Sequence, residues 1–378
     1  MARMDCWSEI APLMGMDPRK LREGFALLEA AVEQGRIPGG VIAVGRNGHI
    51  AEFACGTAFV EEGTAIPAAP GTLYDCASLT KVTATLPLLL MLLEQGRIRL
   101  EDPLARHIPE FAAFSGRKAE ITIGQLLSHT SGLPPTLDPL EPGSGSSRER
   151  IVAQALSVEP DIPPGRQVVY SDVGFILLGL LVEKLLGEPL DQAARRRVFE
   201  PLDMTDTGFV PPPEKLDRTA ETEWYRGEPW PRRGTVHDET AAAMGGVGGH
   251  AGLFSTARDL IRYASMWLGG GALDGRRMLS PDTVALAIRS HTDNASGGHR
   301  GLGWVLKGDK LDASGDSLSP RCYGHTGFTG TSLYADPASG LAVVLLTNAV
   351  RLSRDRAPLF RLRAALHDAI AASIDGGS

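Results

Sequence analysis

A serine and a lysine stand three positions apart at the start of the most apolar segment of the chain. Ser78-Leu-Thr-Lys81 leads directly into the apolar run from Val82 to Leu93. Residues three apart on a helix share one face, so the lysine amine can reach the serine hydroxyl. A helix N-terminus also offers free N–H groups and a partial positive charge to a developing oxyanion. The pair indicates a serine nucleophile with its activator, and a surface lysine is the alternative.

The same spacing occurs again at Ser115-Gly-Arg-Lys118, so the pair alone is a weak signal. The second pair lies in a polar, turn-like stretch and lacks the apolar helix that this chemistry requires. Lysine is also rare here, because most of the 38 Lys and Arg residues are arginine. Only lysine can readily lose its proton and act as a base, so we assign the chemistry to Ser78 and Lys81.

Two further short motifs could complete such a site. Tyr170-Ser-Asp172 precedes an apolar helical stretch, and a tyrosine beside a lysine can relay protons. The alternative is structural, with Ser171 or Asp172 as the N-cap of that helix and Tyr170 packed. Gly324-His325-Thr-Gly327 stands ahead of a strand pattern, where the histidine could orient or protonate a substrate. Alone, that motif would be an ordinary turn.

Elements at both chain ends have the pattern of an α+β domain. Asp17-Pro18 predicts a helix start, Asn47-Gly48 between two apolar runs predicts a hairpin, and two more strands flank the turn at 336–340. A helix closes the chain over 358–374. The middle is mostly helical, over 82–95, 122–129, 149–156, 173–186, 190–199 and 257–268. We therefore expect an antiparallel sheet flanked by N- and C-terminal helices, formed by 1–75 and 246–378, with a helical domain inserted at 76–245.

The composition favours a small-molecule substrate. The net charge of −7 argues against a nucleic-acid or anionic-membrane partner, which would need a basic face. The run from Val82 to Leu93 is too short for the ~20 residues of a membrane span. Asp5 and Glu9 interrupt the apolar core that a signal peptide needs, so we expect a cytoplasmic protein.

Metal, nucleotide and other hydrolase signals are weak or lacking. The four cysteines show no C-x-x-C spacing, and no histidine pair has the spacing of a zinc site. The glycine-rich stretch at 246–251 follows no strand of a βαβ unit, and the G-x-S-x-G elbow does not occur. We expect neither a metal nor a cofactor. The loops at 137–147 and 210–238 are the expected sites of substrate selection. Trp224, Tyr225 and Trp230 in the second loop could form a wall or lid of the site, and the alternative is ordinary packing of that loop on the body.

In order and spacing, the three motifs resemble those of the serine β-lactamase and penicillin-binding superfamily. The resemblance is to the branch of class C β-lactamases, DD-peptidases and family VIII carboxylesterases, which uses S-x-x-K, Y-x-N and K-T-G or H-T-G. It covers nearly the whole chain and includes the longer strings 121–134, 170–175, 245–256 and 324–330. It implies a β-lactamase/transpeptidase-like fold.

The resemblance also implies roles for individual residues. Ser78 would be acylated, with Lys81 and Tyr170 relaying its proton, and His325 would stand where relatives place the K-T-G lysine. The oxyanion would be bound by the N–H groups of Ser78 and Phe328. Asp172, Thr326, Gly327 and Phe328 form the implied substrate-binding and oxyanion group.

Two residues depart from the family pattern. Asp172 replaces the usual asparagine; it cannot donate a hydrogen bond when ionised, and it would hold Lys81 protonated, which shifts the base role toward Tyr170. His325 carries a charge only when protonated, so it would recognise a substrate carboxylate less well than lysine. Both departures favour small acyl esters, so carboxylesterase activity is the main expectation. The alternatives are a β-lactamase, a D-stereospecific peptidase, or a non-turnover penicillin-binding or scaffold protein.

Overall fold

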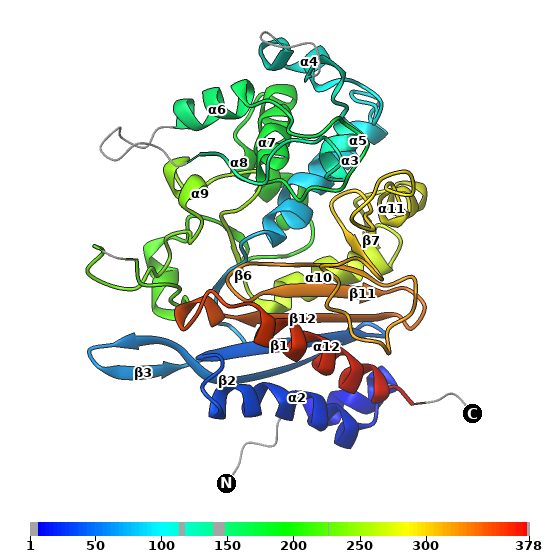
Figure 1. Ribbon diagram of the computed structural model, residues 1–378. Coiled ribbons are helices and arrows are strands. Elements are labelled where there is room, and N and C mark those ends of the chain that lie inside the picture. Colours follow the sequence, from blue (N-terminus) through cyan, green and yellow to red (C-terminus); the bar gives the residue numbers. More distant parts are fainter. Residues whose placement is uncertain (1–6, 113–117, 139–147, 226, 376–378) are drawn as a thin grey trace.

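The computed structural model describes residues 7–112, 118–138, 148–225 and 227–375 (Figure 1). Its centre is a seven-stranded antiparallel sheet with the order β3-β2-β1-β12-β11-β10-β9. The strands are β1 (Gly39–Arg46), β2 (His49–Glu61), β3 (Thr64–Pro67), β9 (Val305–Leu306), β10 (Tyr323–Thr326), β11 (Ser332–Asp336) and β12 (Leu341–Thr347). The two chain ends meet where β1 pairs with β12, with Val41 opposite Leu346.

Strand β1 shows how the sheet joins two hydrophobic layers. Its side chains alternate between faces: Val41 and Ala43 belong to the core shared with α10 (Ala257–Leu268), whereas Ile42 and Val44 belong to the core under the terminal helices. Those helices are α2 (Pro18–Glu33) and α12 (Ala357–Ala372), which lie together on one face of the sheet (Figure 1). A strand buried on both sides cannot show alternating polarity, which explains its continuous apolar run.

The expected terminal elements are confirmed. Asp17 caps α2 by accepting a hydrogen bond from the Arg19 N–H, and Asn47 has the positive φ of 53° that a tight hairpin turn requires. One expectation needs correction: the segment of His325 does not merely precede a strand but forms the short strand β10 itself. The sequence analysis also missed α11 (Pro281–Ile288) and the small sheet β4-β6-β5.

The middle of the chain forms the helical region above the sheet in Figure 1. Its helices are α3 (Leu86–Glu94), α4 (Leu104–His107), α5 (Ile123–Leu127), α6 (Arg148–Ser157), α7 (Asp172–Leu186), α8 (Leu190–Ala194) and α9 (Glu239–Ala243). The small sheet consists of β4 (Tyr74–Asp75), β6 (Leu253–Ser255) and β5 (Gly208–Phe209). The remaining short elements are α1 (Trp7–Ile10), η1 (Ala11–Met14), η3 (Pro109–Ala112), η4 (Lys118–Glu120), η5 (Arg195–Phe199), η6 (Pro213–Arg218), β7 (Ala272–Leu273), β8 (Arg276–Arg277) and η7 (Ala349–Arg351). One hydrophobic core includes residues of both expected domains, and the domain boundaries stay a prediction.

The helical segment that follows the candidate nucleophile Ser78 contains a π-helical turn, η2 (Lys81–Thr85), before α3. Pro87 has no N–H to donate to the preceding turn, which leaves a carbonyl without its helical partner. The Tyr263 hydroxyl of α10 donates a hydrogen bond to the carbonyl of Val82. A distant helix therefore stabilises the wide turn, and such turns are frequent at functional sites.

Candidate active site

Ser78 lies in a tight turn between β4 and the π-helical turn η2. The residue before it, Ala77, has a φ of 46°, which is rare for a residue with a side chain. Asp75 stabilises this conformation, because its Oδ1 accepts a hydrogen bond of 2.8 Å from the Ala77 N–H. Its Oδ2 accepts one of 2.6 Å from the N–H of His237, which joins the turn to the 210–238 loop. The turn leaves Ser78 partly exposed at a cavity.

Lys81 is buried beside Ser78 and has three oxygen partners. Its Nζ lies 3.1 Å from Ser78 Oγ, 3.0 Å from the His250 carbonyl oxygen and 2.6 Å from Asp172 Oδ1. Burial by itself would lower the pKa of Lys81, but Asp172 and Tyr170 offset this, so the pKa is raised. Lys81 is therefore a cation at neutral pH, as expected from the aspartate at position 172, and it cannot accept the Ser78 proton in this state.

Tyr170 packs beside Lys81 at the start of α7. Its ring centre lies 4.9 Å from Lys81 Nζ and 4.6 Å from the His129 ring. No described residue accepts or donates a hydrogen bond at the buried Tyr170 hydroxyl. Ser171 caps α7 through the Gly174 N–H, so the structural interpretation of this motif is confirmed for Ser171, and proton relay by Tyr170 stays a prediction. Because Ser171 is the N-cap of α7, the Asp172 carboxylate can contact Lys81.

His129 is a positioning residue that the sequence analysis did not assign. Its Nδ1 accepts a hydrogen bond of 3.1 Å from the Ser171 N–H. This contact fixes the segment between Tyr170 and Asp172. The sequence near His129 indicates this role only through its place in the string 121–134, because its hydrogen-bond partner Ser171 lies 42 positions away.

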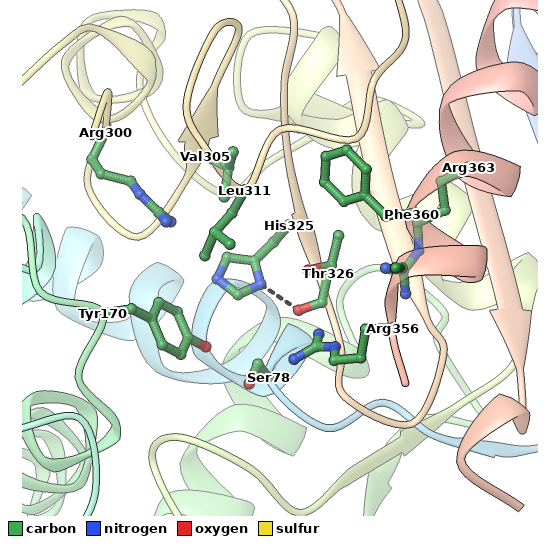
Figure 2. Close-up of a pocket in the computed structure, with 11 residues that line it drawn as sticks. Ser78, Tyr170, Arg300, Val305, Leu311, His325, Thr326, Arg356, Phe360 and Arg363 are labelled. Carbon is green, nitrogen blue, oxygen red and sulfur yellow. Dashed lines mark hydrogen bonds between the residues drawn. The ribbon is translucent and has the colours of Figure 1, made fainter. Parts of the chain in front are cut away.

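His325 is buried and faces the same cavity from β10 (Figure 2). Burial, with the charges of Lys81 and Arg300, lowers its pKa well below 6.5, so the imidazole is neutral at pH 7. Its Nδ1 donates a hydrogen bond of 2.9 Å to the Thr326 carbonyl oxygen, and Nε2 is left as an acceptor. His325 therefore carries no positive charge at pH 7 and cannot recognise a substrate carboxylate as a cation.

The turn after β10 is tied to the backbone that precedes Ser78. The Thr329 hydroxyl donates to the Asp75 carbonyl over 2.6 Å, and the Thr331 hydroxyl donates to the Cys76 carbonyl over 3.1 Å. A side chain at Gly327 would lie 2.1 Å from Thr331 Oγ1, so only glycine allows this approach. These two bonds join residues that are 254 and 255 positions apart in sequence, and they bring the third motif to Ser78.

The two expected oxyanion donors are unused within the described part of the chain. Neither the Ser78 N–H nor the Phe328 N–H donates a hydrogen bond to a described residue. The Phe328 ring stacks on His237 with a centroid separation of 5.5 Å. Beneath the turn, Arg363 donates to the Thr331 carbonyl over 2.6 Å, and its burial lowers its pKa to about 9.

A cavity of about 340 Å³ opens over Ser78. Its walls contain three arginines and no aspartate or glutamate. The lining residues are Ser78, Tyr170, Arg300, Val305, Leu311, His325, Thr326, Arg356, Ala357, Phe360 and Arg363 (Figure 2). Sequence reasoning missed all three arginines, because the chain is rich in arginine and nothing near them marks a site. Arg300 is paired with Asp309 behind the wall, so the positive charge that His325 does not supply comes mainly from Arg356 and Arg363.

Other expectations have mixed outcomes. Lys118 of the second S-x-x-K pair is buried and donates to the Leu156 carbonyl, whereas Ser115 and most of the 137–147 loop lie outside the described residues. Trp224 and Trp230 are exposed and do not line the cavity over Ser78. Within the described ranges, no group of His, Cys, Asp or Glu is arranged to hold a metal ion, and none of the helices there has the length and apolarity to cross a membrane.

Comparison with known proteins places this site in a family. The model of the beta-lactamase family matches residues 25–368. The chain belongs to the beta-lactamase family. A relative from Escherichia coli O157:H7, which its name describes as a candidate D-alanyl-D-alanine carboxypeptidase, is 31% identical over 376 residues, covering 88% of this chain and 83% of the relative.

Two solved structures agree with the beta-lactamase assignment. EstCE1, a hydrolase with promiscuous acyltransferase activity, has a TM-score of 0.72 and 25% identity, covering 92% of this chain and 99% of its own. A class C beta-lactamase from Rhodobacter sphaeroides has a TM-score of 0.71 and 21% identity, covering 92% and 98%. The beta-lactamase/transpeptidase-like fold and the serine hydrolase class are thus confirmed.

Proposed function

We propose that this serine hydrolase removes a carboxylate-bearing residue from D-alanyl peptides, in the manner of a D-alanyl-D-alanine carboxypeptidase. One observation carries the proposal: the cavity over Ser78 has three arginines and no acidic residue among its lining residues. Of the three arginines, Arg356 is the best placed to bind a substrate carboxylate. It is exposed to solvent, its guanidinium carbon lies 4.8 Å from the Phe328 ring centre, and no carboxylate of the described chain pairs with it.

Ser78 attacks the peptide carbonyl, and its proton moves to the Tyr170 oxygen while the Tyr170 hydroxyl gives its own proton to the leaving nitrogen. Lys81 does not take the proton, because the contact with Asp172 keeps it a cation. Its charge, 4.9 Å from the Tyr170 ring centre, stabilises the negative charge that develops on the Tyr170 oxygen during the transfer. The N–H groups of Ser78 and Phe328 bind the oxyanion. Water then hydrolyses the acyl-enzyme, with the proton transfers reversed.

Hydrolysis of small acyl esters is the second candidate. The mechanism on Ser78 would be the same, and the similarity to EstCE1 supports it. The neutral His325 also suits an uncharged substrate. The arginines favour the peptide, because an ester without a carboxylate leaves Arg356 without a partner. The cytoplasmic location stays a prediction.

A substrate panel with matched variants tests the proposal. A D-alanyl-D-alanine peptide, the same peptide with a C-terminal amide, a p-nitrophenyl ester and a chromogenic cephalosporin are compared for turnover, with intact mass to detect acylation. Ser78→Ala should abolish turnover and adduct, whereas the exposed Ser157→Ala should change neither.

Arg356→Gln tests the carboxylate contact. A hydrogen bond to a charged group contributes about 1.5–3 kcal/mol, or roughly 10- to 150-fold. Arg356→Gln should lower kcat/KM by that factor for the free peptide and much less for the amide. Equal turnover of the acid and the amide by the wild type would refute the peptidase proposal and leave the esterase.

A further inference from the structure

Arg300 is fixed at the wall of the cavity by contacts that use only part of its hydrogen-bonding capacity. Its Nε donates a hydrogen bond of 3.1 Å to Asp309 Oδ2, and both side chains are completely buried. Asp309 is itself held, because its two oxygens accept hydrogen bonds of 2.7 Å from the N–H groups of His299 and Leu311. The guanidinium is therefore held rigidly from one side.

The other two guanidinium nitrogens of Arg300 face the cavity. Both Nη1 and Nη2 are buried, and no described residue accepts a hydrogen bond from them. Arg300 lines the cavity with Ser78, and its guanidinium carbon lies 5.8 Å from the Tyr170 ring centre. Buried charged donors without acceptors are costly, so native proteins rarely keep them without a purpose. The fork of two donors has the geometry that binds a carboxylate.

Arg300 and Arg356 lie on opposite sides of His325 in Figure 2, with Arg300 toward Tyr170 and Arg356 toward Ser78. Tyr170 donates a proton to the leaving group in the proposed reaction, so the group departing from Ser78 must come close to Tyr170. The leaving group thus lies where both arginines can reach it. The cavity volume of about 340 Å³ suits a small molecule of this kind.

We propose that Arg300 is a second anion-binding group and that the preferred leaving group carries two carboxylates, such as a D-amino acid with an acidic side chain. Arg356 binds one carboxylate, and Arg300 binds the other through its two free nitrogens. This inference rests on the proposed function, and it goes beyond it by specifying the charge of the leaving group.

Inhibition by small acids tests the second subsite without a natural substrate. Glutarate, with two carboxylates, and butyrate, with one, compete against hydrolysis of p-nitrophenyl acetate. In the wild type, glutarate should bind at least tenfold more tightly than butyrate. Arg300→Lys keeps a cation for Asp309 but loses the fork, so the ratio of the two inhibition constants should fall to about one. Arg356→Gln should weaken both acids, and the exposed Arg321→Gln should preserve the wild-type ratio.

Each outcome decides the proposal. The second anion-binding site is refuted if the inhibition constants of butyrate and glutarate are nearly equal in the wild type. It is refuted also if the preference for glutarate persists in Arg300→Lys. If Arg300→Lys does not fold, the double variant Arg300→Gln, Asp309→Asn removes both charges and is measured instead. A ratio near one together with Arg356-dependent turnover of D-alanyl-D-alanine would leave the proposed function intact. Tight glutarate binding without turnover of any D-alanyl peptide would sink the peptidase proposal alone.

Discussion

Replacing Asp172 with asparagine should make the stability of the protein depend on pH. The carboxylate lies 2.6 Å from the buried Lys81 ammonium and keeps 23% of its side-chain surface exposed. Removing one member of a buried ion pair costs about 3–5 kcal/mol. Since Asp172 is partly solvated and Lys81 keeps two oxygen acceptors, we expect a loss of about 2–3 kcal/mol at pH 7.

The sign of the pH dependence follows from the pKa of Lys81. In the wild type this pKa is raised, so the stabilisation is complete below the unfolded value of about 10.4, and Lys81 adds no slope between pH 6 and 9. In Asp172→Asn, burial dominates and the pKa falls below the unfolded value. Between the folded-state pKa and the unfolded-state pKa of Lys81, the free energy of unfolding should then rise with pH, by up to about 1.4 kcal/mol per pH unit.

Urea denaturation at pH 6, 7, 8 and 9 measures this dependence. Asp172→Glu, which keeps the charge, should retain the flat wild-type profile. The double variant Lys81→Met, Asp172→Asn should lose the new slope, because the titrating group is gone. A variant that is equally destabilised at every pH, or a slope that persists in the double variant, would refute the assignment of Lys81 as the buried cation.

Three further outcomes are expected. The His325 ring should show no titration near pH 6.5 by NMR, since burial lowers its pKa well below that value; a midpoint at 6.5 would contradict the neutral site. Burial lowers the pKa of His367 to about 4, so its contribution to stability is lost as pH falls from 6.5 toward 4. His367→Gln should therefore reduce the acid-induced loss by up to about 1.4 kcal/mol per unit in chemical denaturation, and an unchanged acid profile would contradict this. Gly327→Ala should cost about 1–3 kcal/mol in unfolding free energy and lower kcat, since its Cβ would lie 2.1 Å from Thr331 Oγ1 and 2.6 Å from the Cys76 carbonyl oxygen; wild-type stability and turnover would refute the close packing.

Much of the fold could be predicted because its signals are local. The cap and proline that begin α2, the Asn47-Gly48 turn and the apolar runs of β11 and β12 act over a few neighbouring residues. The short strand β10 was missed as an element, because four residues that include a glycine and a histidine do not show a strand pattern. The π-helical turn η2 was hidden too, since the Tyr263 hydroxyl that stabilises it lies 181 positions away from Val82.

The sequence alone predicted which residues would carry the chemistry, because the spacing of Ser78 and Lys81 and the strings around Tyr170 and His325 are local patterns in the chain. The tertiary structure decided their electrical state and their surroundings. Asp172 makes Lys81 a cation, burial makes His325 neutral, and Asp309 turns Arg300 toward the cavity. The physical reason is that charge and burial depend on every neighbour in space, and those neighbours come from distant positions that no local pattern connects.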